Sequence, residues 1–152
     1  MHLIYKVIFL LFVFFPLKAE ILKPNPSITP IDVVSIQLKA LKDNNIPYEN
    51  AGIEQTWEFA HPSNRIYTGP LERFTNMMYN PSYSMMLNHQ DHKIIIVDEN
   101  DKVAHYFIEL IDDSGKKFGF KWTLKKVESS KDFLNCWMTT SVSSPMLLSQ
   151  SS

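Results

Sequence analysis

The chain has 152 residues, of which 45% are hydrophobic and 20% are charged, and its 15 basic residues nearly balance 16 acidic ones. This size and composition are typical of one globular domain with a packed core, and they exclude a disordered chain. Binding to nucleic-acid phosphates needs a basic excess, so no nucleic-acid partner is expected. The single cysteine, Cys136, cannot form an internal disulfide, and the fold must therefore depend on packing.

The first nineteen residues predict a secretory signal peptide. Lys6 precedes an apolar run over residues 7–15, and the small residue Ala19 suits a cleavage point. The run is about half the length that a membrane-spanning helix needs. We therefore expect a signal peptide at residues 1–19, cleavage after Ala19, and a periplasmic or secreted protein that meets the membrane only during export. Leu17 is larger than the residue usual at its position, and an uncleaved amino-terminal anchor is the alternative.

An extended lead-in and one amphipathic helix follow. Two prolines and their polar neighbours predict an extended lead-in over residues 20–29. Thr29 can cap a helix that begins at Pro30, where the missing backbone donor is not needed. One face at helical spacing is formed by Ile31, Val34, Leu38 and Leu41. The pair Asn44-Asn45, which precedes a proline, should end this helix.

Two shorter helices are predicted around the segment from Trp57 to Phe74. The first runs from about residue 50 to residue 60, and its apolar side is formed by Ile53, Trp57 and Ala60. It ends before Pro62, because a residue that precedes proline is biased away from helical conformation. The other helix starts near Gly69-Pro70 and continues to Asn80-Pro81.

In the second half the hydrophobic period changes to two, which predicts antiparallel strands. Strands are expected over residues 93–97, 103–111, 117–125 and 133–140, with turns at residues 98–101 and 112–115. The third strand has the clearest pattern, because Phe118, Phe120, Trp122 and Leu124 alternate with Lys117, Gly119, Lys121, Thr123 and Lys125. Residues 141–152 are predicted to form a flexible tail.

Helices followed by a strand meander predict an α+β domain over residues 30–140. We expect three amino-terminal helices packed on a curved antiparallel sheet of about four to five strands.

Two runs in the helical half carry a resemblance to a known family. They are Ala60-His61-Pro62-Ser63-Asn64 and Thr68-Gly69-Pro70-Leu71-Glu72-Arg73-Phe74. The stretch over residues 30–140 resembles domain of unknown function 4864, which looks like part of the nuclear transport factor 2-like superfamily. The resemblance implies a cone-like fold with a pocket inside a bent sheet. It implies no activity, since that superfamily holds enzymes beside non-catalytic binding and dimerising modules.

The joint between the second and third predicted helices offers candidate ligand-binding residues. They are Trp57, His61, Arg65, Tyr67 and Arg73. Cations beside aromatic rings could hold a small anionic or partly apolar ligand, and arginine offers a bidentate fork for carboxylate or phosphate. The alternative is structural, with Asn64 and Arg65 bonding loop carbonyls and Glu72 to fix the connection.

His105 and Glu109 are weak catalytic candidates. They lie four residues apart in one predicted strand and therefore on one face of it. On an inward face, His105 could act as a base that Glu109 orients, in an isomerase or dehydratase. The opposite face is at least as apolar, so both side chains could instead point to solvent.

No metal site or cofactor is expected. His89-Gln90-Asp91-His92 holds three metal-capable side chains, but they lie in one loop rather than converging from separate elements. Cys136 has apolar neighbours and is interpreted as a small buried hydrophobe.

The favoured function is an exported, non-catalytic domain that binds a small ligand or serves as an accessory module. An acid–base enzyme is the alternative. A homodimeric or protein-partner-binding module is the second alternative, although the outer sheet face is rich in lysine.

Overall fold

The computed structural model of the chain describes residues 11–14 and 20–149. The predicted signal peptide at residues 1–19, its cleavage after Ala19 and the end of the predicted tail at residues 150–152 lie outside the described residues, apart from residues 11–14. None of the helices described is both long and apolar enough to cross a membrane.

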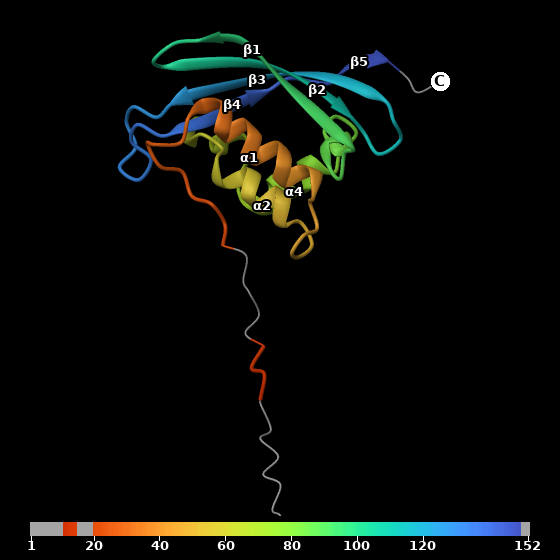
Figure 1. Cartoon of the computed structure of the whole chain (residues 1–152). Coiled ribbons are helices and arrows are strands. Elements are labelled where there is room, and N and C mark those ends of the chain that lie inside the picture. The colour runs from red at the N-terminus through yellow and green to blue at the C-terminus, as the bar shows by residue number, and fades with distance from the viewer. Residues whose placement is uncertain (1–10, 15–19, 150–152) are drawn as a thin grey trace, which may run out of the picture.

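Helices occupy the first half of the described chain (Figure 1). They are α1 (Pro30–Lys42), α2 (Ala51–Glu58), α3 (Pro62–Thr68), α4 (Leu71–Met78) and the short 3-10 helix η1 (Ser84–Met86). The start of α1 is as predicted, since the hydroxyl of Thr29 accepts a hydrogen bond from the backbone N–H of Asp32. The lead-in over residues 20–29 contains neither helix nor strand.

One antiparallel sheet occupies the second half. Its strands are β1 (Asp91–Glu99), β2 (Val103–Ile111), β3 (Lys117–Lys126), β4 (Trp137–Val142) and β5 (Met146–Ser149). The order is β1-β2-β3-β4, and β5 pairs with β3 beyond the end of β4. The α+β class and the meander are therefore confirmed.

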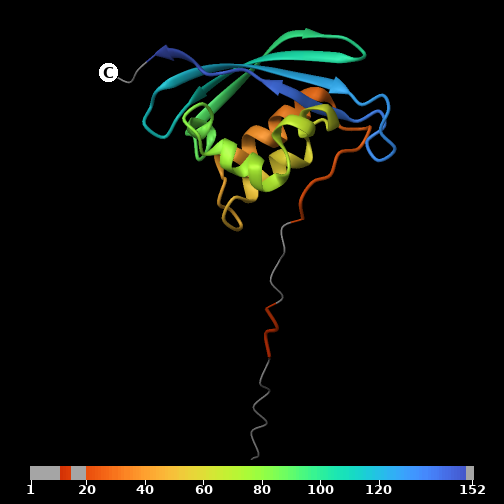
Figure 2. The same cartoon turned by 180° about the vertical axis from the view of Figure 1, so that it is seen from behind.

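The helices cover one face of the sheet, and the core lies between the two layers (Figures 1 and 2). The buried face of β2 consists of Ala104, Tyr106, Ile108 and Leu110, and the buried face of β3 consists of Phe120, Trp122 and Leu124. These side chains form one hydrophobic cluster with α1 residues such as Val34 and Leu38. The predicted alternation in β3 is confirmed from Phe120 to Leu124.

Two differences from the predicted elements concern the helical joint and the chain end. The prediction of three helices is wrong, because residues 62–68 form α3, whose first position is Pro62. A proline ends the helix before it but suits the first turn of a new one. The last strand and the tail also differ from the prediction, since β4 covers Trp137–Val142 instead of residues 133–140 and residues 146–149 form β5. Strand β5 gains its hydrogen bonds from β3, a partner that the tail sequence does not reveal.

The joint between α2 and α3 is fixed to the edge of the sheet. The backbone N–H of Thr139 donates to the carbonyl of Phe59, and the N–H of His61 donates to the carbonyl of Thr139, both at 2.8 Å. Ala60 thereby forms a parallel bridge with Thr139. The joint thus holds α2 and α3 against β4.

Candidate functional site

A cavity of about 160 Å³ lies between the helices and the sheet. Its apolar lining comes from Leu41, Ala60, Phe74, Met77, Met78, Met86, Trp122 and Val142. Its polar lining comes from Gln37, Thr56, Asn64, Thr68, Tyr83, Thr139, Thr140 and Ser141. Every helix and both strands β3 and β4 contribute, so the cavity exists only in the assembled fold.

At the wall of this cavity, Gln37 of α1 forms hydrogen bonds to α2, β3 and β4. Its Nε2 donates to the carbonyl of Thr56 in α2 at 3.1 Å. Its Oε1 accepts from the indole Nε1–H of Trp122 at 3.2 Å and from the hydroxyl of Thr139 at 2.7 Å. The indole also lies 3.1 Å from the Thr139 hydroxyl. Gln37, Trp122 and Thr139 are all buried, so their hydrogen bonds replace those that water would make.

The cavity wall carries no formal charge as far as the described residues show. Its lining includes no Asp, Glu, Lys, Arg or His side chain. The polar groups facing it are amides, hydroxyls and one indole. Such a wall can form neutral hydrogen bonds and apolar contacts, and it offers no counter-ion to a charged ligand.

Arg65 is used by the fold rather than aimed at the cavity. Its Nε donates to the carbonyl of Ala60, and its Nη2 donates to the carbonyls of Trp57 and Glu58, at 2.9 to 3.0 Å. The guanidinium also lies over the ring of Trp57, 4.8 Å from its centroid. Since the last carbonyls of a helix lack partners within it, Arg65 caps the end of α2. Burial lowers the pKa of Arg65.

The other predicted ligand residues also lie outside the cavity lining. Trp57 packs against Phe74, with ring centroids 5.2 Å apart. His61 caps α3, because its Nδ1 accepts from the backbone N–H of Ser63 at 3.1 Å. Burial, and then the charge of Lys125, lower the pKa of His61. Tyr67 and Arg73 are exposed. The structure therefore brings Trp57 and Arg65 together as a structural joint, but it does not bring the predicted set to one pocket.

His105 and Glu109 lie on the face of the sheet that points away from the helices. His105 is exposed and lies 3.2 Å from the hydroxyl of Thr123, and Glu109 pairs with Lys117 at 3.2 Å. The inward orientation that the acid–base hypothesis required is wrong. Burial of the larger apolar set, which includes Tyr106, Ile108 and Leu110, decides which face of β2 turns inward.

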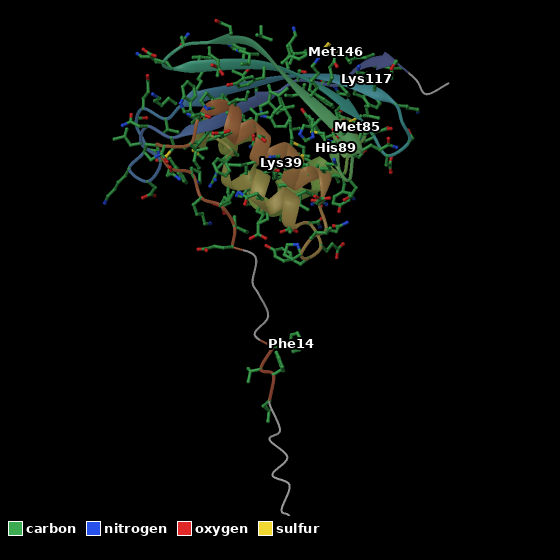
Figure 3. The ribbon with its side chains drawn as sticks, viewed as in Figure 1. Phe14, Lys39, Met85, His89, Lys117 and Met146 are labelled. Atoms are coloured by element: carbon green, nitrogen blue, oxygen red, sulfur yellow. The ribbon has the colours of Figure 1, made fainter. Side chains whose placement is uncertain are left out.

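His89 and His92 form a hydrogen-bonded pair, and Figure 3 shows His89 beside α1. The Nδ1 of His89 lies 2.7 Å from the carbonyl of Met86, and its Nε2 lies 2.7 Å from the Nδ1 of His92. A carbonyl only accepts, so Nδ1–H of His89 donates, and its Nε2 accepts from His92. Burial, above all, lowers the pKa of His89 to about 4. Among residues 11–14 and 20–149, no group of three or more His, Cys, Asp or Glu side chains could hold a metal ion.

Sequence reasoning missed the polar wall of the cavity. Gln37 gave one signal, because it lies beside Leu38 on the apolar face of a predicted helix. A polar residue there must find a buried partner. The partners were not predictable, since Trp122 and Thr139 lie 85 and 102 residues away in the chain.

The fold and the cavity define the described part of this chain as a small α+β domain with a cavity between its two layers whose lining carries no charged side chain. No family model, curated protein or solved structure compared with the chain matches it.

Proposed function

We propose that this chain is an exported, non-catalytic domain that binds a small, uncharged and partly apolar ligand in the cavity between its helices and sheet. The observation that carries the proposal is the cavity of about 160 Å³ whose lining contains no charged side chain among the described residues.

The volume of the cavity suits a ligand of about one aromatic ring with a small substituent. A buried apolar cavity of about 150 Å³ is known to hold benzene, and the cavity here is of similar volume. Met77, Met78 and Met86 contribute flexible, polarisable side chains that adapt to an irregular ligand. The amide of Asn64 and the hydroxyl of Tyr83 supply polar groups that could orient it.

A cavity lining without charged side chains among the described residues favours a neutral ligand over an anionic one. A buried carboxylate without a partner loses its hydration and gains no counter-ion, which is costly. Arg65 lies outside the cavity lining, and its Nε and Nη2 donors already bond three carbonyls. The anionic ligand expected from the sequence therefore loses its support.

Two further parts of the proposal rest on the sequence. The apolar run before Ala19 supports export to the periplasm or the outside of the cell, with an uncleaved anchor as the alternative. The runs around His61 and Pro70 support a nuclear transport factor 2-like domain, in which the sheet curves around the cavity.

A thermal-shift comparison of benzamide with benzoate tests the proposal, because the two compounds have similar shape and differ in charge. Every described hydrogen bond between elements lies within residues 20–149, so the chain from Glu20 to Ser152 carries the fold. Benzamide should raise the melting temperature of this chain, by about 4 °C at ten times its Kd. Benzoate should not raise it.

Two variants complete the test. Met77→Trp places a larger side chain at the cavity wall and should remove the response to benzamide. Asn76→Trp adds the same side chain at the neighbouring exposed position and should keep the response. The proposal fails if benzamide has no effect on the unaltered chain, or if Met77→Trp responds as strongly as Asn76→Trp.

A further inference from the structure

Strand β1 has an open edge. It pairs with β2 on one side, and no other strand of the described chain pairs with it. The opposite edge of the sheet differs, because Ala60 forms a bridge with Thr139 of β4. Figure 1 shows β1 running along the margin of the sheet. An open edge presents unpaired backbone donors and acceptors that a further strand can use.

The middle of β1 is apolar and partly exposed. Four β-branched residues run from Ile94 to Val97, and the exposed fractions of Ile96 and Val97 are 56% and 64%. Edges that must stay unpaired usually carry a charge in their middle. In β1 the charged residues Asp91, Lys93, Asp98 and Glu99 lie toward the two ends.

The register with β2 assigns each β1 residue to a face. Lys93, Ile95 and Asp98 lie opposite Glu109, Phe107 and His105, on the outer face. His92, Ile94, Ile96 and Glu99 lie opposite Leu110, Ile108, Tyr106 and Ala104, on the face toward the helices. The irregularity between Ile96 and Asp98 leaves Val97 outside this alternation, so Asp98 follows Ile95 on the outer face.

We propose that two copies of this chain pair antiparallel through their β1 edges, with Ile95 of each copy at the twofold axis. Such an axis is perpendicular to the sheet and keeps each face on its own side, so opposing residues must come from the same face. With Ile95 at the centre, Ile94 lies opposite Ile96, Lys93 lies opposite Asp98, and His92 lies opposite Glu99. Each of these pairs occurs twice.

A twofold axis at Ile94 or at Ile96 would bring less complementary residues into opposing positions. With Ile94 at the centre, Asp91 would lie opposite Asp98, and like charges in opposing positions are unfavourable. With Ile96 at the centre, Asp98 and Glu99 would lie opposite isoleucines. Because β1 is complementary to itself in this register, a second copy of the chain fits its edge better than a peptide of another protein would.

The first test is the dimer dissociation constant of the chain from Glu20 to Ser152, measured by sedimentation over a wide concentration range. The unaltered chain should form a dimer. Lys93→Asp should raise the dissociation constant about tenfold or more, because both Lys93–Asp98 pairs become acid–acid pairs. Lys93→Asp combined with Asp98→Lys should restore it. Lys121→Asp, an exposed change on the outer face of β3, should leave it unchanged.

The second test is cross-linking, which does not depend on charge. Opposing Cβ atoms in an antiparallel pair lie about 5 Å apart, so two Ile95→Cys chains should join through a short thiol-specific linker. Thr123→Cys, on the outer face of β3, should not join in the same way. A monomer at all concentrations overturns the proposal. A dimer that Lys121→Asp weakens and Lys93→Asp does not, or one that the double charge reversal fails to restore, overturns it as well.

Discussion

The substitution Gln37→Glu should destabilise the fold in a pH-dependent way. Gln37 is buried, and its Nε2 donates to the carbonyl of Thr56 while its Oε1 accepts from Trp122 and Thr139. A protonated carboxyl at this position reproduces all three bonds, since its O–H can donate to the Thr56 carbonyl. An ionised carboxylate has no proton to donate there, and no charged side chain lines this wall in the described chain.

The magnitude follows from the cost of burying that charge. Burial raises the pKa of a carboxyl by about 3 units or more above its usual value of about 4.3. Each unit corresponds to about 1.4 kcal/mol, so the variant should lose about 3 to 4 kcal/mol of unfolding free energy by pH 7. The sign follows because the native state keeps a proton that the unfolded chain releases. The loss therefore begins above the unfolded pKa and grows with pH.

Urea unfolding of the chain from Glu20 to Ser152, followed by circular dichroism at several pH values, measures this effect against the unaltered chain. Gln37→Leu is the control. It leaves the Thr139 hydroxyl without its acceptor and should cost about 2 to 3 kcal/mol at every pH. A cost of Gln37→Glu that does not change between acidic and neutral pH would show that water reaches this position, and it would refute the reasoning.

Three further predictions concern the packing of α2, its cap and the histidine pair. Gly52→Ala should cost about 2 kcal/mol or more in urea unfolding, because the added Cβ would lie 2.1 Å from the carbonyl oxygen of Ala40; a neutral effect would contradict the close approach of α1 and α2. Arg65→Met should cost about 2 kcal/mol, since it removes three bonds to carbonyls at the end of α2; an unchanged stability would show that Arg65 is not the cap. The pKa of His89 is lowered to about 4 in the native state, whereas an unfolded histidine has a pKa of about 6.5. As pH falls from about 6.5 toward 4, the unfolded chain therefore takes up a proton at this residue that the native state does not. The free energy of unfolding should fall by about 3 kcal/mol over this range. The variant His89→Gln should remove this part of the pH dependence, and the idea fails if the slope is the same in both proteins.

Local signals explain what the sequence predicted well. The cap at Thr29 and the apolar spacing of α1 depend on neighbouring residues, and the bounds of β2 as predicted match the structure. In β3 the alternation from Phe120 to Leu124 fixes the buried face directly. The predicted burial of Cys136 is confirmed for the same reason, since its apolar neighbours indicated it.

The candidate site could not be predicted to the same degree, because its residues meet only through the fold. The sequence suggested that Arg65 anchors an anion, but each hydrogen bond described for its side chain goes to a backbone carbonyl at or just beyond the end of α2. Strand β2 has two apolar faces, so periodicity could not place His105. The joint from Trp57 to Phe74 fixes α2 and α3 to β4. It supplies part of the cavity lining, but through residues such as Ala60 and Asn64 rather than through the predicted ligand residues, and the rest of the lining is distant in the chain.

The most direct test of the proposed function is NMR of methionine methyl groups during titration with benzamide. Met77, Met78 and Met86 line the cavity, whereas Met138 and Met146 do not. A ring bound in the cavity should shift the methyl signals of the first three and leave the last two in place. Saturable shifts of this kind would support a cavity for a neutral ligand. No shift at any concentration, or shifts as large at Met146 as at Met78, would contradict it.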